Sequence, residues 1–405
     1  MAAEFGGIHR FEVENFLSIR DRQVLDFVVP SIDPSDSYRY IHTPRGYVPK
    51  VIGFFGANGS GKSNVLIAMQ YLAHFIAHSF DFRPSQNPIP FAFASQECLK
   101  QQIRLSVAFS SAIGPNGRQS SERLSSVDPT KVDYEISAIG SNVVHENLSA
   151  YGESGEREVW FERDSKGYVF ADEKFVHPAI LSKMPPVRRN CSTVSFFSQF
   201  NIEGVSIIWN QASMIRGNAF QTTPSLSSHV LSAPYIEDRE LLKELQHQID
   251  RIDLGINDVN IFLSGTDHDL QFNHAGLDWP LFSANESHGT KMFVYFFPMI
   301  QYVLKNGSIL LIDEIDQSLH PDIVSEILSW FLNPERNPHN AQLIFSAHDT
   351  TLMRHLNRNE LFLCEKSADG ATIVTGLRQF SDLGDDEPLE VLYRHGAFGA
   401  IPRIG

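Results

Sequence analysis

The amino-acid sequence predicts an α/β fold, in which a core built on a parallel β-sheet is split by a long insertion. Short apolar runs at 51–55, 308–312 and 342–345 are typical of buried strands, and segments with helical spacing lie between and after them. Between about residues 100 and 175, apolar and polar side chains instead alternate with a period of two. Strands that alternate with helices indicate a parallel sheet, whereas the period of two indicates a separate antiparallel sheet.

The chain divides into three regions on these patterns. Residues 1–80 and 263–405 form the predicted core, residues 81–175 an antiparallel β-subdomain, and residues 176–262 a helical insertion. We expect helices over 62–79, 240–252 and 292–304, each with one apolar face, and short strands at 11–13 and 24–27 near the N-terminus. Residues 164–167 have the composition of a hairpin turn, and residues 110–128 that of a mobile loop. The sequence shows no heptad run, so no long coiled coil is expected.

Composition limits the possible surroundings and partners. The formal net charge is -15, which argues against a surface broadly committed to nucleic acid, although it leaves room for a local basic groove. Cys98, Cys191 and Cys364 are far apart in sequence, with no paired spacing. We therefore expect a reduced, cytoplasmic setting and no zinc site. The apolar stretch 292–304 is shorter than the ~20 residues that span a bilayer, and the first residues lack the features of a signal peptide. We therefore expect a cytoplasmic protein without a membrane partner.

The segment between the first buried strand and the helix after it matches the phosphate-loop pattern G-x-x-x-x-G-K-[ST]. Glycines let the backbone curl so that its N–H groups face phosphates, and the following helix N-terminus adds partial positive charge. Lys62 is expected to reach the β- and γ-phosphates of ATP, and the Ser63 hydroxyl to bind Mg²⁺. The predicted nucleotide-binding residues here are Gly56, Ala57, Asn58, Gly59, Ser60, Gly61, Lys62, Ser63 and Asn64.

A second apolar strand, 309–312, ends in the acidic pair Asp313-Glu314. Asp313 at the strand end is expected to hold Mg²⁺ through water. Glu314 is placed to polarise the attacking water as a general base. The sequence therefore predicts an ATPase, and we expect its turnover to be slow.

With these motifs, the sequence resembles the ABC/SMC/RecF-like ATPases. The segment Ser287-His288-Gly289-Thr290 is similar to their signature motif, whose Ser287 and Gly289 positions would contact the γ-phosphate held by a second subunit. Ser318-Leu319-His320-Pro321 stands at the D-loop position. His348, after the strand 342–345, stands where the family has a switch histidine that senses the γ-phosphate. The resemblance implies a homodimer, or a higher homo-oligomer, assembled by sandwiching ATP.

Further segments narrow the resemblance to stand-alone bacterial AAA-type ATPases of the RloA and AbiL kind, which include the ATPase subunit of PARIS-type anti-phage systems. This group implies a regulatory ATPase that controls a separately encoded effector, such as a toxin or a TOPRIM-like nuclease. The alternative is a RecF/SMC-like ATPase that acts directly on DNA in repair or recombination. The net negative charge of the chain does not favour this alternative. The segments that carry the resemblance are 253–256, 286–290, 313–316, 318–321, 337–344, 365–366, 369–370 and 396–402.

Several positions depart from the family pattern or invite other interpretations. The signature lacks a double glycine, residues 357–360 (Asn-Arg-Asn-Glu) replace the usual Arg-Arg-Asp, and only Gln86 and Gln96 are candidates for the Q-loop. His74 and His78 have a metal-binding spacing, but we expect a helix face there. The triplet 267–269 (Asp-His-Asp) superficially resembles the acids of a TOPRIM nuclease, but we expect a polar turn.

Overall fold

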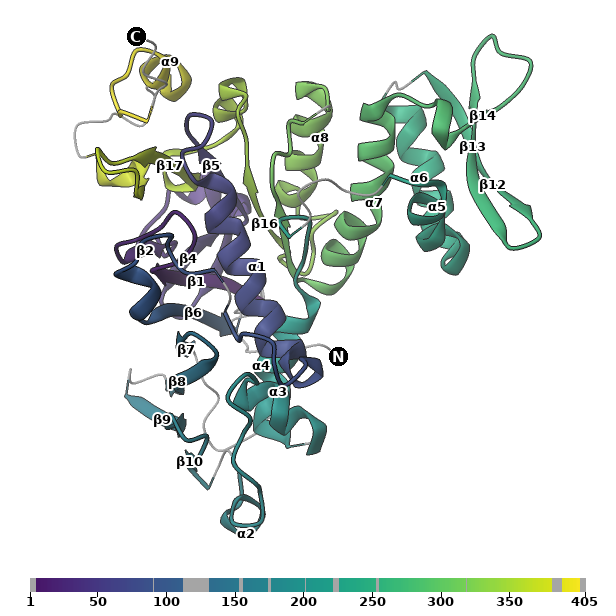
Figure 1. Ribbon diagram of the computed structural model, residues 1–405. Helices are drawn as coiled ribbons and strands as arrows, with labels where there is room; N and C mark the ends of the chain where they lie inside the picture. The colour runs from purple at the N-terminus through teal and green to yellow at the C-terminus, as the bar shows by residue number, and fades with distance from the viewer. Residues whose placement is uncertain are drawn as a thin grey trace.

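The computed structural model describes residues 5–89, 91–111, 131–152, 156–173, 176–200, 202–220, 226–252, 255–317, 319–380 and 388–400. Figure 1 shows two sheets that share a long central helix, with a separate lobe of helices and strands to one side. Within these residues no helix has the length and apolar character needed to cross a bilayer.

The core is a six-stranded sheet with strand order β11-β15-β16-β5-β17-β18, and only β18 runs antiparallel to its neighbour. The three apolar runs predicted as buried strands are β5, β15 and β16, and every residue in them is buried. Because the carboxyl ends of parallel strands lie at one edge of a sheet, the segments after these three strands meet there. The strands are β5 (Val51–Phe55), β11 (Arg216–Gly217), β15 (Ile309–Ile312), β16 (Gln342–Ser346), β17 (Leu361–Lys366) and β18 (Thr372–Gly376).

Helices cover both faces of the core sheet, as expected for the predicted α/β fold class. Alternate residues of β5 lie in different hydrophobic clusters, with Phe54 on the side of α1 and Phe55 on the side of α7 and α8. The helices predicted at 62–79 and 292–304 are confirmed as α1 (Lys62–His78) and α7 (His288–Asn306). Residues of α3 (Thr193–Phe197) and α4 (Glu203–Met214) lie in the same cluster as α1, and residues of α8 (Pro321–Leu332) and α9 (Leu389–Arg394) in the same cluster as α7.

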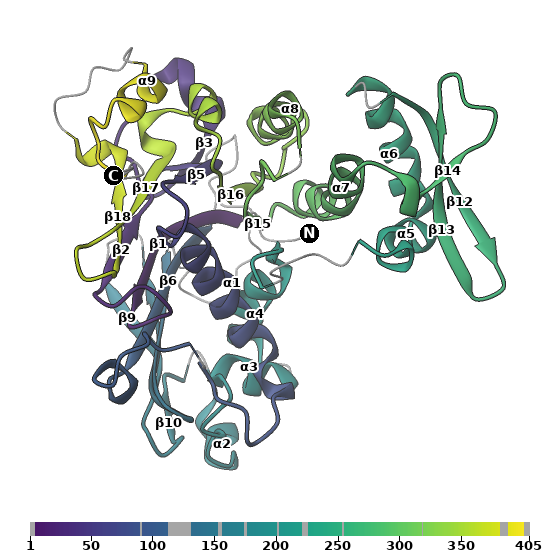
Figure 2. The same ribbon diagram turned by 45° about the horizontal axis from the view of Figure 1, so that its top comes forward.

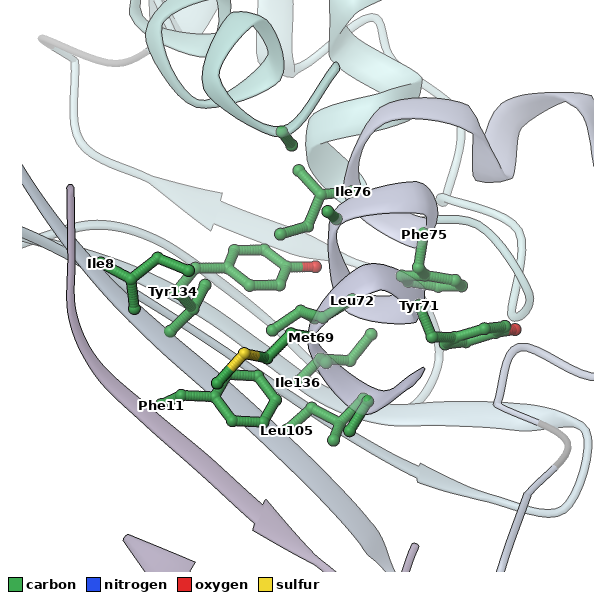
Figure 3. Packing of buried hydrophobic residues seen from close by; sticks show 14 of the residues in the cluster. Ile8, Phe11, Met69, Tyr71, Leu72, Phe75, Ile76, Leu105, Tyr134 and Ile136 are labelled. Carbon is green, nitrogen blue, oxygen red and sulfur yellow. The ribbon is translucent and has the colours of Figure 1, made fainter. Parts of the chain in front are cut away.

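The second sheet is antiparallel, with strand order β10-β9-β8-β7-β6-β1-β2. The hairpin predicted around 164–167 is confirmed by the pairing of β9 with β10. Figure 3 shows α1 packing Met69 and Leu72 against Phe11 and Leu105 of this sheet. The predicted loop 110–128 lies almost wholly outside the described residues. The strands are β1 (Phe5–Glu14), β2 (Gln23–Asp26), β6 (Ile103–Ser111), β7 (Lys131–Ile139), β8 (Asn142–Tyr151), β9 (Arg157–Arg163) and β10 (Val169–Ala171).

The N-terminal strands differ from their predicted placement. β1 and β2 fall within residues 1–80 of the predicted core, yet β1 pairs with β6 and is therefore a strand of the antiparallel sheet. The apolar residues of β1, such as Phe11 and Val13, are buried in the same cluster as α1. Strand pairing between residues about 90 positions apart leaves no mark in a local sequence pattern. Beside β1 lies a two-stranded hairpin of β3 (Tyr40–Thr43) and β4 (Gly46–Pro49).

The lobe in residues 226–282 combines helices with a small sheet. The helix predicted at 240–252 is confirmed as α6 (Arg239–Arg251), which follows α5 (Ser228–Glu237). The structure then differs from the predicted helical insertion 176–262, because β12 (Ile256–Ser264) crosses that boundary and pairs with β13 (Asp267–His274). The expected polar turn at 267–269 is wrong, since these residues begin β13 and only Gly265 and Thr266 form the turn. Val259, Leu270 and Phe272 have no exposed surface, which fixes this register.

Candidate active site

The phosphate loop connects β5 to α1 through three glycines with positive φ. The φ angles of Gly56, Gly59 and Gly61 are 149°, 74° and 105°. A Cβ atom on Gly56 would lie 2.2 Å from the Cys364 carbonyl oxygen, and one on Gly61 would lie 2.1 Å from Thr372 Oγ1. No side chain caps the N-terminus of α1, so its partial positive charge faces the loop. The loop therefore has left-handed backbone angles and close approaches at the positions where the sequence pattern places glycine.

The two glycines Gly61 and Gly59 offer a matched test of this loop. Gly61→Ala is expected to lower the free energy of unfolding by about 1–3 kcal/mol and to weaken ATP binding, because it combines backbone strain with the clash against Thr372. Gly59→Ala also strains a positive φ, but its Cβ has no atom within 4 Å. Thermal unfolding and nucleotide titration of both variants measure the difference. Equal effects of the two substitutions would contradict the role of the close approach at Gly61.

Lys62 lies across the phosphate loop and contacts its carbonyl groups. Its Nζ donates hydrogen bonds to the carbonyl oxygens of Gly56 (2.8 Å) and Ala57 (3.2 Å). Nζ is also 3.2 Å from Nδ1 of His348. Burial lowers the pKa of the Lys62 ammonium, while Asp313 and Glu314 nearby favour its charge. The ammonium thus lies between the loop and the acidic strand end.

A chain of hydrogen-bonded polar side chains supports the loop, and sequence patterns do not reveal most of it. Thr372 Oγ1 donates to the Ser60 carbonyl oxygen (2.8 Å) and lies 2.7 Å from Ser18 Oγ. Asn64, predicted to bind nucleotide, donates its Nδ2 to Ser18 Oγ at 2.6 Å. Lys366 Nζ donates to Thr372 Oγ1 at 3.1 Å. Ser18 and Thr372 are 354 positions apart, so no sequence motif marks them.

Asp313 and Glu314 are held at the end of β15 by a serine on β16. The Ser346 hydroxyl donates to Asp313 Oδ1 and accepts from the backbone N–H of Glu314 at 2.8 Å. Glu314 has a φ of 53°, a left-handed conformation that is uncommon outside glycine and frequent at functional sites. Burial raises the pKa of Asp313, whereas hydrogen bonds from Ser346 and Ser63 lower it.

The oxygen atoms of Ser63 and Asp313 fit the predicted magnesium role. These two side chains form a hydrogen bond with each other, so their oxygen atoms are adjacent. Mg²⁺ prefers oxygen ligands and binds through one or two protein groups together with phosphates and water. Among the described residues no cluster of three or more His, Cys, Asp or Glu side chains has metal-binding geometry.

Ser346→Ala is expected to raise the pKa of Asp313 further and to reduce Mg²⁺-dependent turnover about tenfold or more, because a hydrogen bond to a charged group contributes about 1.5–3 kcal/mol. Turnover measured over a range of Mg²⁺ concentrations and pH values checks this. Ser308→Ala is the matched control, since Ser308 is buried before the same strand and bonds the Met214 carbonyl oxygen. An unchanged Mg²⁺ requirement in Ser346→Ala would rule out the proposed support of Asp313.

His348 joins the phosphate loop to the acidic pair. Its Nε2 lies 3.4 Å from Glu314 Oε1, while Nδ1 faces Lys62. The backbone N–H groups of His348 and Asp349 both donate to Asp316 Oδ2, at 2.8 and 2.6 Å. The structure therefore brings together the predicted residues Lys62, Ser63, Asp313, Glu314 and His348 at one edge of the core sheet.

Asn218 is a polar neighbour of Asp313 that the sequence did not reveal. It follows the two-residue strand β11, accepts from the Asp313 N–H (2.8 Å) and donates to the Asp313 carbonyl oxygen (3.2 Å). The Q-loop candidates Gln86 and Gln96 are exposed and lie in the segment before β6. A single asparagine after so short a strand carries no recognisable signal.

Ser287 and Gly289 lie apart from the phosphate loop of the same chain. Ser287 is the exposed N-cap of α7, and its Oγ accepts from the Thr290 N–H at 3.0 Å. In both Figure 1 and Figure 2 the beginnings of α1 and α7 are well separated. Of the D-loop segment 318–321, residue 318 lies outside the described residues, and His320 caps α8 (Pro321–Leu332).

Residues 357–360, which differ from the Arg-Arg-Asp of the family pattern, have a structural role in this chain. Glu360 is fully buried and forms a two-point ion pair with Arg39, with distances of 2.9 and 2.6 Å. Its carboxylate also accepts from the Asn357 N–H at 2.7 Å. This segment therefore anchors β17 to the hairpin β3–β4.

The phosphate loop, the acidic strand end and the histidine after the neighbouring strand meet at one edge of an α/β core sheet, the arrangement of a P-loop ATPase. The chain belongs to the family described as "AAA domain, putative AbiEii toxin, Type IV TA system", whose model matches residues 51–354, more than half of the chain. No curated protein sequence matches the chain.

Several solved structures of SMC head domains are similar at low identity. A head bound to the C-terminal winged-helix domain of ScpA has 14% identity and a TM-score of 0.49, covering 92% of this chain and 99% of that chain. The head domain from Thermotoga maritima has 14% identity and a TM-score of 0.40, with 91% and 98% covered. A head with an extended coiled coil, derived from Pyrococcus furiosus and bound to the C-terminal domain of ScpA, has 14% identity and a TM-score of 0.46, with 96% and 99% covered.

Proposed function

We propose that this protein hydrolyses ATP slowly and uses the nucleotide to assemble with a second copy of itself. The observation that supports hydrolysis is the meeting of Lys62, Asp313, Glu314 and His348 at one sheet edge. Lys62 binds the β- and γ-phosphates. Ser63 and Asp313 would hold Mg²⁺, which would supply positive charge to the phosphates. Glu314 accepts the proton of the attacking water, and His348 contacts the γ-phosphate.

The experiment that tests hydrolysis is phosphate release by the purified protein with ATP and Mg²⁺. Lys62→Ala is expected to reduce turnover by at least about 10²-fold, because it removes a charge aimed at the phosphates of the transition state. Lys243→Ala is the control, since Lys243 lies on α6 in an exposed ion pair with Glu240. If Lys62→Ala hydrolyses ATP at the wild-type rate, the activity comes from a different site or from a contaminating enzyme.

The position of Ser287 supports assembly in pairs. This exposed N-cap lies away from the phosphate loop of its own chain, so a contact with a γ-phosphate requires a second chain. In the proposed pair, each ATP lies between one phosphate loop and the Ser287–Gly289 turn of the other subunit. ATP then favours the pair and hydrolysis favours its separation, a two-state equilibrium set by the nucleotide.

The family description names a putative toxin of a type IV toxin–antitoxin system, which supports a role for this chain in a system of that kind. Within that class we propose an anti-phage ATPase of the RloA and AbiL kind, which restrains a separately encoded toxin or TOPRIM-like nuclease. Co-expression with the neighbouring gene and co-purification with and without ATP tests this. A product that always purifies alone, together with DNA binding that weakens steeply with salt, would instead favour the RecF/SMC-like function on DNA.

A further inference from the structure

The three-stranded sheet of the side lobe presents apolar side chains to solvent. The sheet consists of β12, β13 and β14 (Leu281–Phe282), and it projects away from both large sheets in Figures 1 and 2. Its inner face is buried against α5 and α6. Phe262 and Phe282 lie on the other face, with their ring centroids 5.2 Å apart, and Leu277 and Trp279 lie in the turn before β14. Trp279 is 81% exposed, and each of the other three is more than a third exposed. We call these four residues the Trp279 surface.

The Trp279 surface is tied to the turn that carries Ser287. Trp279 lies in the turn between β13 and β14, and Phe282 pairs with Gln271 across the sheet. His274, at the base of that turn, contacts Glu286 with 2.5 Å between Nε2 and Oε1. The other carboxylate oxygen of Glu286 accepts from the Ser287 N–H at 3.3 Å. A subunit that binds Ser287 therefore approaches the Trp279 surface as well.

Charge favours the phosphate-loop side of another copy as the partner. Residues 256–282 contain no Lys or Arg and four aspartates, one of which, Asp278, is the immediate neighbour of Trp279. Lys366 borders the phosphate loop of this chain, where it is bonded to Thr372, which bonds the Ser60 carbonyl oxygen. Arg20, two residues from Ser18, is already ion-paired with Asp21 and Asp369, so Lys366 is the cation that this border offers to a partner. Exposed Trp also has the aromatic face on which Lys and Arg side chains stack.

We propose that the Trp279 surface is a docking surface for a second copy of this chain. It packs on the border of the partner's phosphate loop, beside Lys366, when the Ser287 turn contacts the nucleotide held there. This inference rests on the proposed pairing around ATP and adds to it a contact that does not involve the nucleotide. Trp at the centre of a desolvated contact commonly contributes a large share of the affinity.

The test measures ATP-dependent pairing in the Glu314→Gln background, where hydrolysis does not separate the subunits. Trp279→Ala is expected to raise the Kd for pairing by at least about tenfold, by light scattering or sedimentation with ATP and Mg²⁺. Binding of a fluorescent ATP analogue to the single chain should stay unchanged, because β13 and β14, which flank Trp279, lie away from the start of α1 in Figures 1 and 2. Phe170→Ala is the matched control, since Phe170 is 67% exposed on β10 of the other sheet.

Each outcome bears on the proposal. Pairing of Trp279→Ala with the affinity of the Glu314→Gln parent overturns the inference, leaves pairing around ATP intact, and assigns the surface to a different protein. An equal loss in Phe170→Ala overturns it too, because the effect then comes from removing any exposed aromatic. A Glu314→Gln parent that binds ATP and stays single at all concentrations overturns the proposed pairing together with this inference.

Discussion

Replacing Glu314 by Gln is expected to slow ATP hydrolysis by about 10²–10⁴-fold while ATP binding is retained. A positioned general base contributes a factor of this size, and the amide of Gln keeps the shape of the side chain but does not accept the proton. Glu314 is held by its backbone, through the N–H bond to Ser346 Oγ, so the substitution should leave the phosphate loop in place. Single-turnover phosphate release and nucleotide titration measure the two quantities separately.

The same variant should accumulate the ATP-bound pair, because hydrolysis is the proposed step that separates it. Glu240→Gln is a suitable control, since Glu240 has a 75% exposed side chain on α6. Hydrolysis close to the wild-type rate in Glu314→Gln would assign the base to another residue. His348 would then be the first candidate, since its Nε2 lies 3.4 Å from Glu314 Oε1.

The residues of the active site that can be predicted from sequence are those in contiguous segments. Residues 56–63 and 313–314 follow buried strands directly, so the motif gives both the residue types and their place at the sheet edge. The prediction of His348 depends on the third strand and on the family resemblance. In the structure His348 lies beside Lys62 and Glu314. The sequence pattern alone does not predict this contact, because it does not say how far apart the strands lie.

The supporting residues could not be predicted, because they come from distant segments that only the fold joins. Ser18 and Thr372 meet behind the phosphate loop across 354 positions, and Asn218 meets Asp313 across 95. Both contacts use ordinary polar side chains in short or irregular segments. The pairing of β1 with β6 is hidden for the same reason, since a strand pattern shows which face is buried but does not show which strand lies beside it.

The small sheet β12–β13–β14 is hidden in the sequence for a different reason. Its strands carry many polar residues, and only one face of the sheet, with Val259, Leu270 and Phe272, is buried. The helical residues on either side dominate a wide sequence window. The exposed apolar residues of its other face, including Phe262, further obscure the alternation.

The largest expected effect on stability comes from a buried ion pair in the antiparallel sheet. Arg163 and Glu146 have no exposed side-chain surface, and their closest distance is 3.1 Å. Arg163 also donates to the carbonyl oxygens of Cys191 and Arg188. Glu146 accepts from the Tyr134 hydroxyl at 2.7 Å and from Thr193 at the start of α3. The pair therefore joins strands β7, β8 and β9 to the helix that packs on α1.

Arg163→Met is expected to lower the free energy of unfolding by about 3–5 kcal/mol, because Glu146 keeps its buried charge without a cation. Denaturant unfolding followed by fluorescence measures the change. Arg104→Met is the matched control in the same sheet, since the ion pairs of Arg104 with Glu14 and Glu135 are partly exposed and contribute at most about 1 kcal/mol.

The double variant Arg163→Met/Glu146→Leu separates the cost of an unpaired charge from the loss of packing. Removing both charges should recover some of the stability lost in Arg163→Met, because buried ion pairs replaced by apolar residues of similar volume are often neutral or stabilising. Recovery stays incomplete, since the carbonyl oxygens of Cys191 and Arg188 and the Tyr134 hydroxyl lose partners. A double variant less stable than Arg163→Met would show instead that the hydrogen bonds of Glu146 outweigh the cost of burying its charge.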